Sequence, residues 1–470
     1  MKLESITLKN YRLFSELTCD FHPELTVFVA NNGGGKTSIL DAIRVAYGTY
    51  LGAFPSGNGV GIHLSDVRQI KSQDELALMD RVFPSEIHAT GTLRQSDRRT
   101  SWFRAVNTSK SGTTIKDARE LATYAKDLQS TGVQEIDKTN WPLLAYYGTG
   151  RLWSQKKLTA AKMFLTGYDS RTAAYMDCME PASSYKYFVE WFGYAYRSIT
   201  QSKIRFMEAN PNATAQEVTA HQSAFSPLVS AVQEAVNTVL APSGWKNLWY
   251  SETDKEVTVV HDQFGKLAGS QLSDGIRNTL ALVADIAFRA VHLNPHLGNR
   301  AAKDAQGIVL IDEVDMHLHP SWQQTILANL RDAFPRLQFI VTTHSPQVLT
   351  SVDRSCIRLL QQETDVKTGK LKTVVNPVLL QTLGVSSTDL LAQIMGVDPI
   401  PDVPEARLLS EYHALIQQNL HESLEGKEQR NQLESHFGAE HPVMRECDRM
   451  IRLQILKQKL PMSTPPALAK

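Results

Sequence analysis

The sequence predicts an α/β protein built around a parallel sheet that carries a phosphate-binding loop and is flanked by helices. The short apolar strand 25–29 leads into the glycine-rich segment 30–37, and apolar residues at helical spacing follow that segment. The runs 308–311 and 339–342 are continuously apolar, as strands buried on both faces of a parallel sheet are. Strand, glycine-rich loop and helix in this order are the local context that phosphate binding needs.

The first predicted part, residues 1–150, combines the phosphate loop with an antiparallel β lobe. A strand-like segment begins the chain over about 3–8, and the segments 86–93 and 100–106 are expected to pair with each other. This lobe is predicted to lie beside the parallel sheet.

Three further parts are predicted along the chain. Residues 151–250 form a helical insertion, in which no heptad repeat indicates a long coiled coil. Residues 251–375 form a second lobe, which carries the remaining motifs. Residues 376–470 form a helical extension, and a proline-rich tail from about 461 is expected to be disordered.

The bulk composition is that of an ordinary globular protein. Of 470 residues, 42% are hydrophobic and 21% are charged. The 49 lysines and arginines balance 49 aspartates and glutamates, so the whole chain has no net charge to steer it toward nucleic acid. Its four cysteines are isolated from one another. Without a signal-peptide block or an apolar run that could cross a bilayer, the expected location is the cytoplasm and no membrane partner is expected.

The phosphate loop offers the groups that bind the triphosphate of ATP. Backbone N–H groups at the start of a helix surround phosphates, and glycines let the backbone approach them closely. Lys36 offers a positive charge, and the Thr37 hydroxyl suits Mg²⁺. Ala30 stands where this pattern usually begins with glycine, which would be harmful if that residue needed a positive φ. The expected nucleotide-binding residues of the loop are Asn31, Asn32, Gly33, Gly34, Gly35, Lys36, Thr37 and Ser38.

Three polar residues at the ends of predicted strands are the expected catalytic groups. Asp312 follows an apolar strand and is placed to hold Mg²⁺ together with Thr37. Glu313 is the candidate general base for the attacking water. His344 follows the next apolar strand and is placed to bond the γ-phosphate.

A second anion site is predicted at 272–275, which reads Leu-Ser-Asp-Gly and opens a helix. The Ser273 hydroxyl, the Gly275 N–H and the helix N-terminus together suit a phosphate. One chain does not need two such sites for one triphosphate, whereas a head-to-tail homodimer uses both. Taken alone, Ser273 is as consistent with an ordinary helix N-cap.

In their order, these motifs resemble the ATP-binding-cassette superfamily, in its soluble branch of SMC, RecF and OLD-type heads. Within that branch the chain is similar to the PtuA-type ATPases of Septu and retron-linked anti-phage systems. The resemblance implies an ABC-type ATPase head, in which Arg12 touches the nucleotide and Asp315 lies in the loop that contacts the other subunit. The segments that carry it are 9–14, 145–151, 272–277, 308–320 and 338–346.

The resemblance also implies a glutamine that contacts Mg²⁺, for which Gln155 and Gln69 are alternatives, with Arg151 near the same junction. His317 and His319 suggest a metal pair, but two histidines without a third ligand are more often loop and packing residues.

The expected function is an ATPase of an anti-phage defence system. Residues 350–470 predict helices rather than a Toprim nuclease domain, and their histidines lack the spacing of an HNH metal finger. The resemblance therefore implies a homodimer or a higher even-numbered oligomer that regulates a partner HNH nuclease of the PtuB kind. Nucleic acid would reach it through that complex or through a retron reverse transcriptase. Two alternatives are a RecF-like repair ATPase that clamps DNA without a nuclease, and the nucleotide-binding subunit of a transporter.

Overall fold

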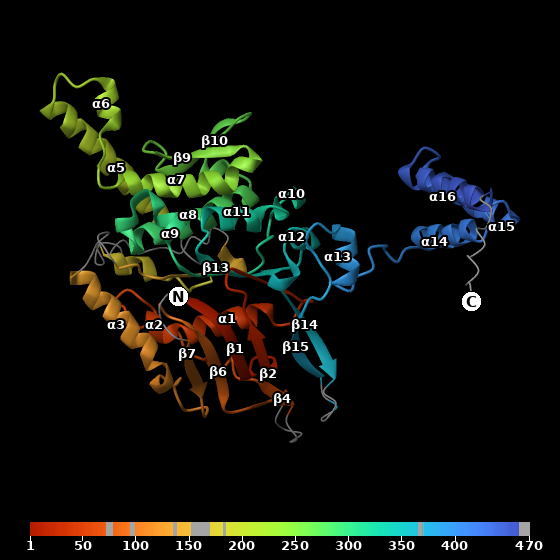
Figure 1. The fold of residues 1–470 in the computed structure, drawn as a ribbon, viewed down its shortest axis with the longest axis horizontal. Helices are drawn as coiled ribbons and strands as arrows, with labels where there is room; N and C mark the ends of the chain where they lie inside the picture. The colour runs from red at the N-terminus through yellow and green to blue at the C-terminus, as the bar shows by residue number, and fades with distance from the viewer. Residues whose placement is uncertain are drawn as a thin grey trace, which may run out of the picture. The chain divides into compact units, whose positions relative to one another are not determined.

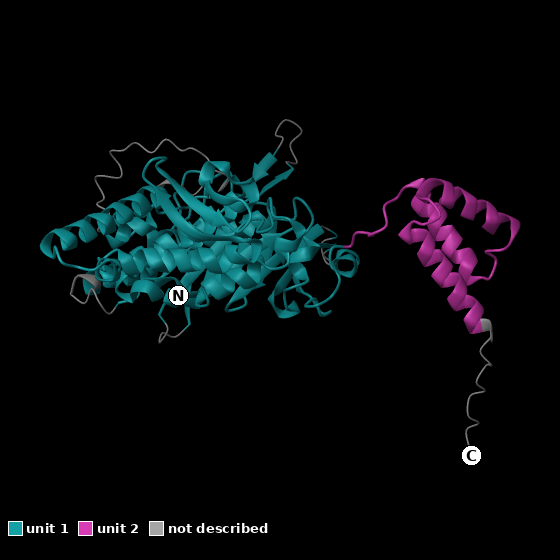
Figure 2. Ribbon diagram, turned by 90° about the horizontal axis from the view of Figure 1, so that it is seen from above, with its two compact units in different colours: residues 1–395 teal, residues 396–470 magenta. Residues whose placement is uncertain are grey.

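The structure, a computed structural model, describes residues 1–71, 79–94, 99–134, 139–151, 170–181, 185–364, 369 and 371–459. The chain forms two compact units, residues 1–395 and residues 396–470 (Figure 2). The predicted α/β class with a helical C-terminal part is confirmed. The four-part division of the chain stays a prediction, and the expected disordered tail lies outside the described residues.

A six-stranded sheet forms the centre of the first unit (Figure 1). All neighbouring strands are parallel except β14 and β15. Four strands, β3, β13, β12 and β8, are buried at every position, which explains their apolar sequences. The strand order is β15 (Leu371–Pro377), β14 (Ile357–Thr364), β3 (Leu25–Val29), β13 (Leu337–Thr343), β12 (Gly307–Ile311) and β8 (Leu143–Tyr147).

An antiparallel sheet forms the predicted β lobe. Its order is β2 (Phe14–Asp20), β1 (Lys2–Tyr11), β6 (Ser85–Thr92) and β7 (Thr100–Val106). The expected pairing of 86–93 with 100–106 is confirmed by the β6–β7 ladder. The tip of the β1–β2 hairpin packs on the phosphate loop, because a Cβ on Gly35 would lie 2.5 Å from the Phe14 ring.

Helices cover both faces of the parallel sheet. Helix α1 (Lys36–Ala46) contacts β6, β7 and β13, so it lies between the two sheets. Helices α7 (Ser226–Leu240) and α8 (Asp274–Leu293) pack against each other, and α8 contacts β8. Figure 1 shows α7 and α8 on the face of the sheet opposite α1.

The other elements of this unit are short or peripheral. They are α2 (Gly48–Leu51), β4 (Gln69–Lys71), β5 (Met79–Arg81), α3 (Arg119–Gln134), α5 (Tyr185–Ala209), α6 (Ala215–Ala220), β9 (Trp245–Ser251), β10 (Glu256–His261), β11 (Gly265–Ala268), α9 (Ala301–Asp304), α10 (Pro320–Gln323), α11 (Ile326–Ala333), α12 (Pro346–Leu349) and α13 (Ser387–Gln393). Strands β9, β10 and β11 form a small antiparallel sheet next to α7.

The second unit consists of three helices, α14 (Pro404–Gln417), α15 (Leu424–Phe437) and α16 (Pro442–Lys459). Its small core holds Tyr412, Ile416, Leu433, Met444 and Cys447. Among all described helices of the chain, none combines the length and the apolar character that a membrane crossing requires.

Candidate nucleotide-binding site

The phosphate loop joins the carboxyl end of β3 to the start of α1. Gly33 and Gly35 adopt left-handed φ values of 75° and 95°, which glycine takes without strain. Gly34 is confined differently, since a Cβ there would lie 2.8 Å from the Ala30 Cβ. Ala30 itself is not among the residues with positive φ, so its methyl group costs no backbone strain. Within the loop, Asn31 and Asn32 are exposed, whereas Ser38 is buried in α1.

Lys36 is buried at the first position of α1. Its Nζ donates a hydrogen bond of 2.8 Å to the carbonyl oxygen of Ala30, at the start of the loop. Burial lowers the pKa of Lys36, while the nearby carboxylates of Asp312, Glu313 and Asp315 raise it. The Lys36 side chain therefore links the two ends of the phosphate loop, and the charges of all three acids act on it.

Thr37 and Asp312 meet although 275 positions separate them in the chain. The Thr37 hydroxyl donates to Asp312 Oδ2 at 2.7 Å, and the Thr342 hydroxyl donates to Asp312 Oδ1 at 2.6 Å. The Asp312 N–H donates to the Tyr147 carbonyl at 2.8 Å, which fixes the backbone as well. A hydroxyl and a carboxylate are the oxygen ligands that Mg²⁺ prefers, so this pair fits the expected metal.

Glu313 and His344 follow the neighbouring strands β12 and β13. Glu313 has a left-handed φ of 48°, which costs about 1 kcal/mol or more for a residue with a side chain. Its N–H donates to the Thr342 hydroxyl at 2.8 Å, so the same threonine orders both acids. His344 is exposed at the end of β13. Both residues therefore stand at the carboxyl edge of the sheet, the edge that bears the phosphate loop.

The loop 313–319, which begins at the second of the two acids, is held by contacts that the local sequence does not indicate. Asp315 accepts a 2.6 Å hydrogen bond from the Thr343 hydroxyl. Gln323, which the sequence analysis missed, accepts from the Ser345 hydroxyl at 2.7 Å and donates to the Leu318 carbonyl at 3.0 Å. The loop is thereby attached to the segment that carries His344.

His317 and His319 have structural roles in this loop. His317 has a positive φ of 63°, and His319 caps α10 by accepting from the Ser321 N–H. Within the part of the chain that the structure describes, no group of three or more His, Cys, Asp or Glu residues is arranged to hold a metal.

Ser273 and Gly275 begin helix α8 as expected. Ser273 is the exposed N-cap residue, and its side chain makes no capping hydrogen bond. Gly275 lies directly against the loop 313–319, because a Cβ there would be 2.3 Å from the His317 carbonyl oxygen. Over the described residues, no hydrogen bond or ion pair joins Ser273 or Gly275 to the phosphate loop of the same chain.

Two carboxylates fix the position of the Arg12 side chain. It lies at the β1–β2 turn with a φ of 49°. Its Nη1 pairs with Asp41 Oδ2 at 2.6 Å, and its Nε donates to Asp66 Oδ1 at 3.0 Å. Burial raises the pKa of Asp41, and Arg12 opposes that shift. Because Asp41 belongs to α1, the ion pair ties the hairpin to the phosphate-loop helix.

Neither of the two glutamines predicted as the Mg²⁺ contact is placed at the site by the described residues. Gln155 lies outside the described residues, and Gln69 is an exposed residue of the small β4–β5 hairpin. Arg151 ends a short 3-10 helix after β8, and its side chain is outside the description.

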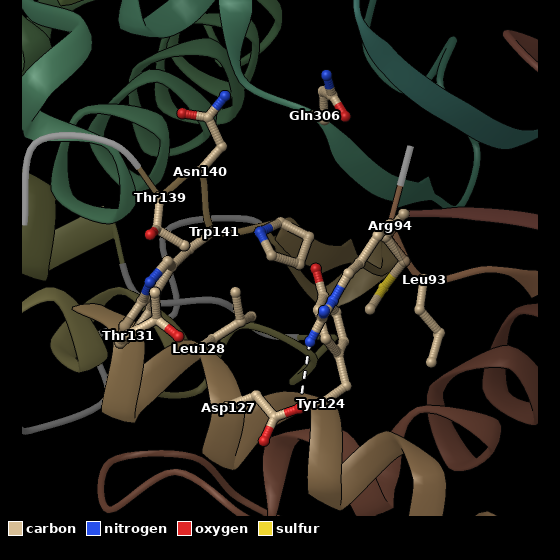
Figure 3. A pocket seen from close by; sticks show the side chains of 12 residues that line it. Leu93, Arg94, Tyr124, Asp127, Leu128, Thr131, Thr139, Asn140, Trp141 and Gln306 are labelled. Atoms are coloured by element: carbon tan, nitrogen blue, oxygen red, sulfur yellow. Dashed lines mark hydrogen bonds and ion pairs between the residues drawn. The ribbon is translucent and has the colours of Figure 1, made fainter. Parts of the chain in front are cut away.

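A separate cavity of about 310 Å³ lies at the opposite edge of the sheet (Figure 3). Tyr124 and Asp127 line it from α3, and Trp141 and Gln306 line it just before β8 and β12 begin. Because the strands are parallel, this is their amino edge, whereas the phosphate loop follows the carboxyl end of β3. The cavity is therefore distinct from the nucleotide site.

Two family models match the chain. One, described as an AAA domain, matches residues 5–192. The other, an AAA domain whose description names the AbiEii toxin and a type IV TA system, matches residues 184–350. Together they span both lobes that contribute to the site.

Similar proteins extend the match along the chain. A retron Vc95 probable ATPase of Vibrio cholerae is 27% identical over 91% of this chain and 86% of its own length. A retron Ec83 probable ATPase of Escherichia coli is 28% identical over 97% and 87%. A Septu protein PtuA of Bacillus mycoides is 36% identical, over 31% of this chain and 19% of its own length. Among solved structures, an SMC head domain from Thermotoga maritima aligns with 81% of this chain and 100% of its own at 13% identity and a TM-score of 0.42, a distant likeness.

Proposed function

The chain is a relative of the retron ATPases and of Septu PtuA, and on this basis we propose that it is the ATP-hydrolysing subunit of an anti-phage defence complex. The observation that carries the ATPase part is the 2.7 Å hydrogen bond between Thr37 Oγ1 and Asp312 Oδ2. It places the Thr37 hydroxyl beside the carboxylate that directly follows β12, and Lys36 directly precedes Thr37 in the chain.

Each site residue then has a role in hydrolysis. The loop N–H groups and Lys36 would bind the phosphates, and Thr37 and Asp312 would hold Mg²⁺, which would supply positive charge to the phosphates. Glu313 accepts the proton of the attacking water, and His344 contacts the γ-phosphate. Arg12, which pairs with Asp41 of α1, contacts the nucleotide from the β1–β2 turn in this proposal.

The complete site is proposed to need two copies of the chain. Ser273 is exposed at the N-terminus of a 20-residue helix, and its hydroxyl is not used for capping. A helix N-terminus with a free hydroxyl favours a phosphate. Since these groups make no bond to their own phosphate loop, a head-to-tail dimer would let each copy cover the nucleotide of the other. In such a pairing ATP would contact both subunits, so it would bind the closed dimer more tightly than the separate subunits.

The test of ATP binding is the substitution Lys36→Ala. Loss of the buried ammonium should abolish measurable ATP binding, because no other cation is expected to contact the phosphates from the loop. Titration with a fluorescent ATP analogue measures it, and circular dichroism controls for folding. Wild-type affinity in this variant would refute the assignment.

A nuclease partner is proposed to dock on the three-helix unit 396–470. This unit exposes apolar side chains that its small core does not cover, including Leu424 at 89%, Leu456 at 57% and Leu453 at 48% exposure. Apolar side chains exposed to this degree on a small unit are available to a partner surface. An HNH endonuclease is the partner that the similarity to PtuA suggests.

Deletion of residues 400–470 tests this docking site. The shortened chain should keep ATP binding, because the phosphate loop and Ser273 both lie in the first unit, and should lose co-purification with a co-expressed PtuB-like HNH nuclease. The full chain carrying Lys36→Ala is the matched control. Undiminished co-purification of the shortened chain would place the dock elsewhere.

A further inference from the structure

A buried ion pair lies in the middle of α8, the helix that begins at Ser273. Arg289 Nε donates to Asp285 Oδ2 at 2.8 Å, and both side chains are only 2% exposed. Taking two charges out of water costs several kcal/mol for each, and apolar residues of similar size often pack as well or better. An ion pair that is buried at this cost is suited to fixing the helix in one defined position.

Tyr147 connects this pair to Asp312. Its hydroxyl donates to Asp285 Oδ2 at 2.7 Å, and its main-chain carbonyl accepts from the Asp312 N–H at 2.8 Å. Tyr147 ends β8 and pairs in register with Ile311, the residue before Asp312. A shift of α8 that moves Asp285 therefore acts on the backbone that places Asp312.

Arg289 extends the connection toward the phosphate-loop helix. Its Nη1 donates to the carbonyl oxygens of Ala174 at 2.6 Å and Met176 at 3.2 Å. A few residues further on, Glu180 accepts a 2.6 Å hydrogen bond from Arg44 of α1. Helix α8 is thus attached both to the strand beside Asp312 and to the helix that follows the phosphate loop.

We propose that Tyr147, Asp285 and Arg289 are positioning residues that couple the two nucleotide sites of a dimer. The inference rests on the proposed function, in which Asp312 serves the nucleotide in its own loop and Ser273 serves the partner's nucleotide. A nucleotide that reorders Asp312 then acts through Tyr147 on how α8 presents Ser273. Such a link transmits information only if α8 has two positions that bind the partner with different affinity.

The substitution Tyr147→Phe is the sharpest test, because it removes one hydroxyl and keeps the ring. ATP affinity of the separate subunit should stay within about twofold of wild type. ATP-driven dimerisation should weaken about fivefold or more, the lower end of typical allosteric coupling, and the Hill coefficient of hydrolysis should fall toward one. Analytical ultracentrifugation with and without ATP measures the first effect, and ATP titration of hydrolysis measures the second.

Tyr47→Phe is the matched control. Tyr47 is fully buried, and its ring packs against Trp102 rather than against α8. It should leave dimerisation and the Hill coefficient unchanged. Equal losses in both variants, or no loss in Tyr147→Phe, would overturn the coupling while the proposed function stands. If wild-type protein fails to dimerise on ATP, the proposed function fails, and the coupling with it.

Discussion

At the scale of residues, the site is defined by a few close contacts around Asp312. Both of its carboxylate oxygens accept hydroxyl hydrogen bonds, from Thr37 and Thr342, and its N–H is bonded to Tyr147. Thr342 also receives the Glu313 N–H, so one threonine fixes the positions of both acids. This arrangement holds Glu313 in a left-handed conformation next to a carboxylate that is already ordered.

Glu313→Gln separates binding from hydrolysis. The amide keeps the shape of the side chain but accepts no proton, so hydrolysis should fall by about 10²–10⁴-fold while ATP affinity is retained. Phosphate release and ATP-analogue titration measure the two quantities. Hydrolysis at the wild-type rate would exclude Glu313 as the base.

Single residues differ in how well the sequence predicted them. Lys36 and Thr37 begin α1 after the loop that follows β3, and Asp312 follows β12, so all three lie at the edge their motifs indicate, because a parallel sheet brings its carboxyl ends to one edge. Gln323 and Tyr147 were not predicted. Their roles come from side-chain bonds to Ser345 and Asp285, which are 22 and 138 positions away, and no local pattern encodes such pairs.

At the scale of elements, the start of α8 and the loop 313–319 form one packed junction. Gly275 faces the His317 carbonyl so closely that its missing Cβ decides the contact. The sequence predicts that Gly275 binds phosphate through its N–H, and the structure adds this packing role. Because Ser273 lies two residues earlier, the junction sets where the second anion site stands relative to the acids.

Gly275→Ala tests the junction. The added methyl group would meet the His317 carbonyl at 2.3 Å and force the helix start away from the loop. Forced overpacking typically costs about 1–3 kcal/mol, and here we expect that loss in ATP-driven dimerisation rather than in ATP binding. Gly112→Ala, where nothing lies within 4 Å of the new Cβ, is the silent control. Dimerisation equal to wild type in Gly275→Ala would show that the junction does not position Ser273.

At the scale of the whole molecule, each chain of the proposed dimer would contribute to two different nucleotide sites. The phosphate loop, Asp312, Glu313 and His344 share one edge of the sheet, whereas Ser273 begins a helix that is bonded elsewhere. Motif order predicts the parallel sheet and its phosphate loop, which form the centre of the first unit. The separate three-helix unit 396–470 was predicted only as helical, since its boundary depends on contacts and not on composition.

The central claim, that Lys36 of one subunit and Ser273 of the other hold the same nucleotide, is tested most directly by mixing two inactive variants. Lys36→Ala keeps an intact Ser273, and Ser273→Arg keeps an intact phosphate loop. A mixed pair then contains one complete site, whereas a pair of either variant alone contains none. We predict that tagged Lys36→Ala subunits capture untagged Ser273→Arg subunits when ATP and Mg²⁺ are added, above the level without ATP. No ATP-dependent capture in the mixture, under conditions where wild-type subunits capture each other, would contradict the account.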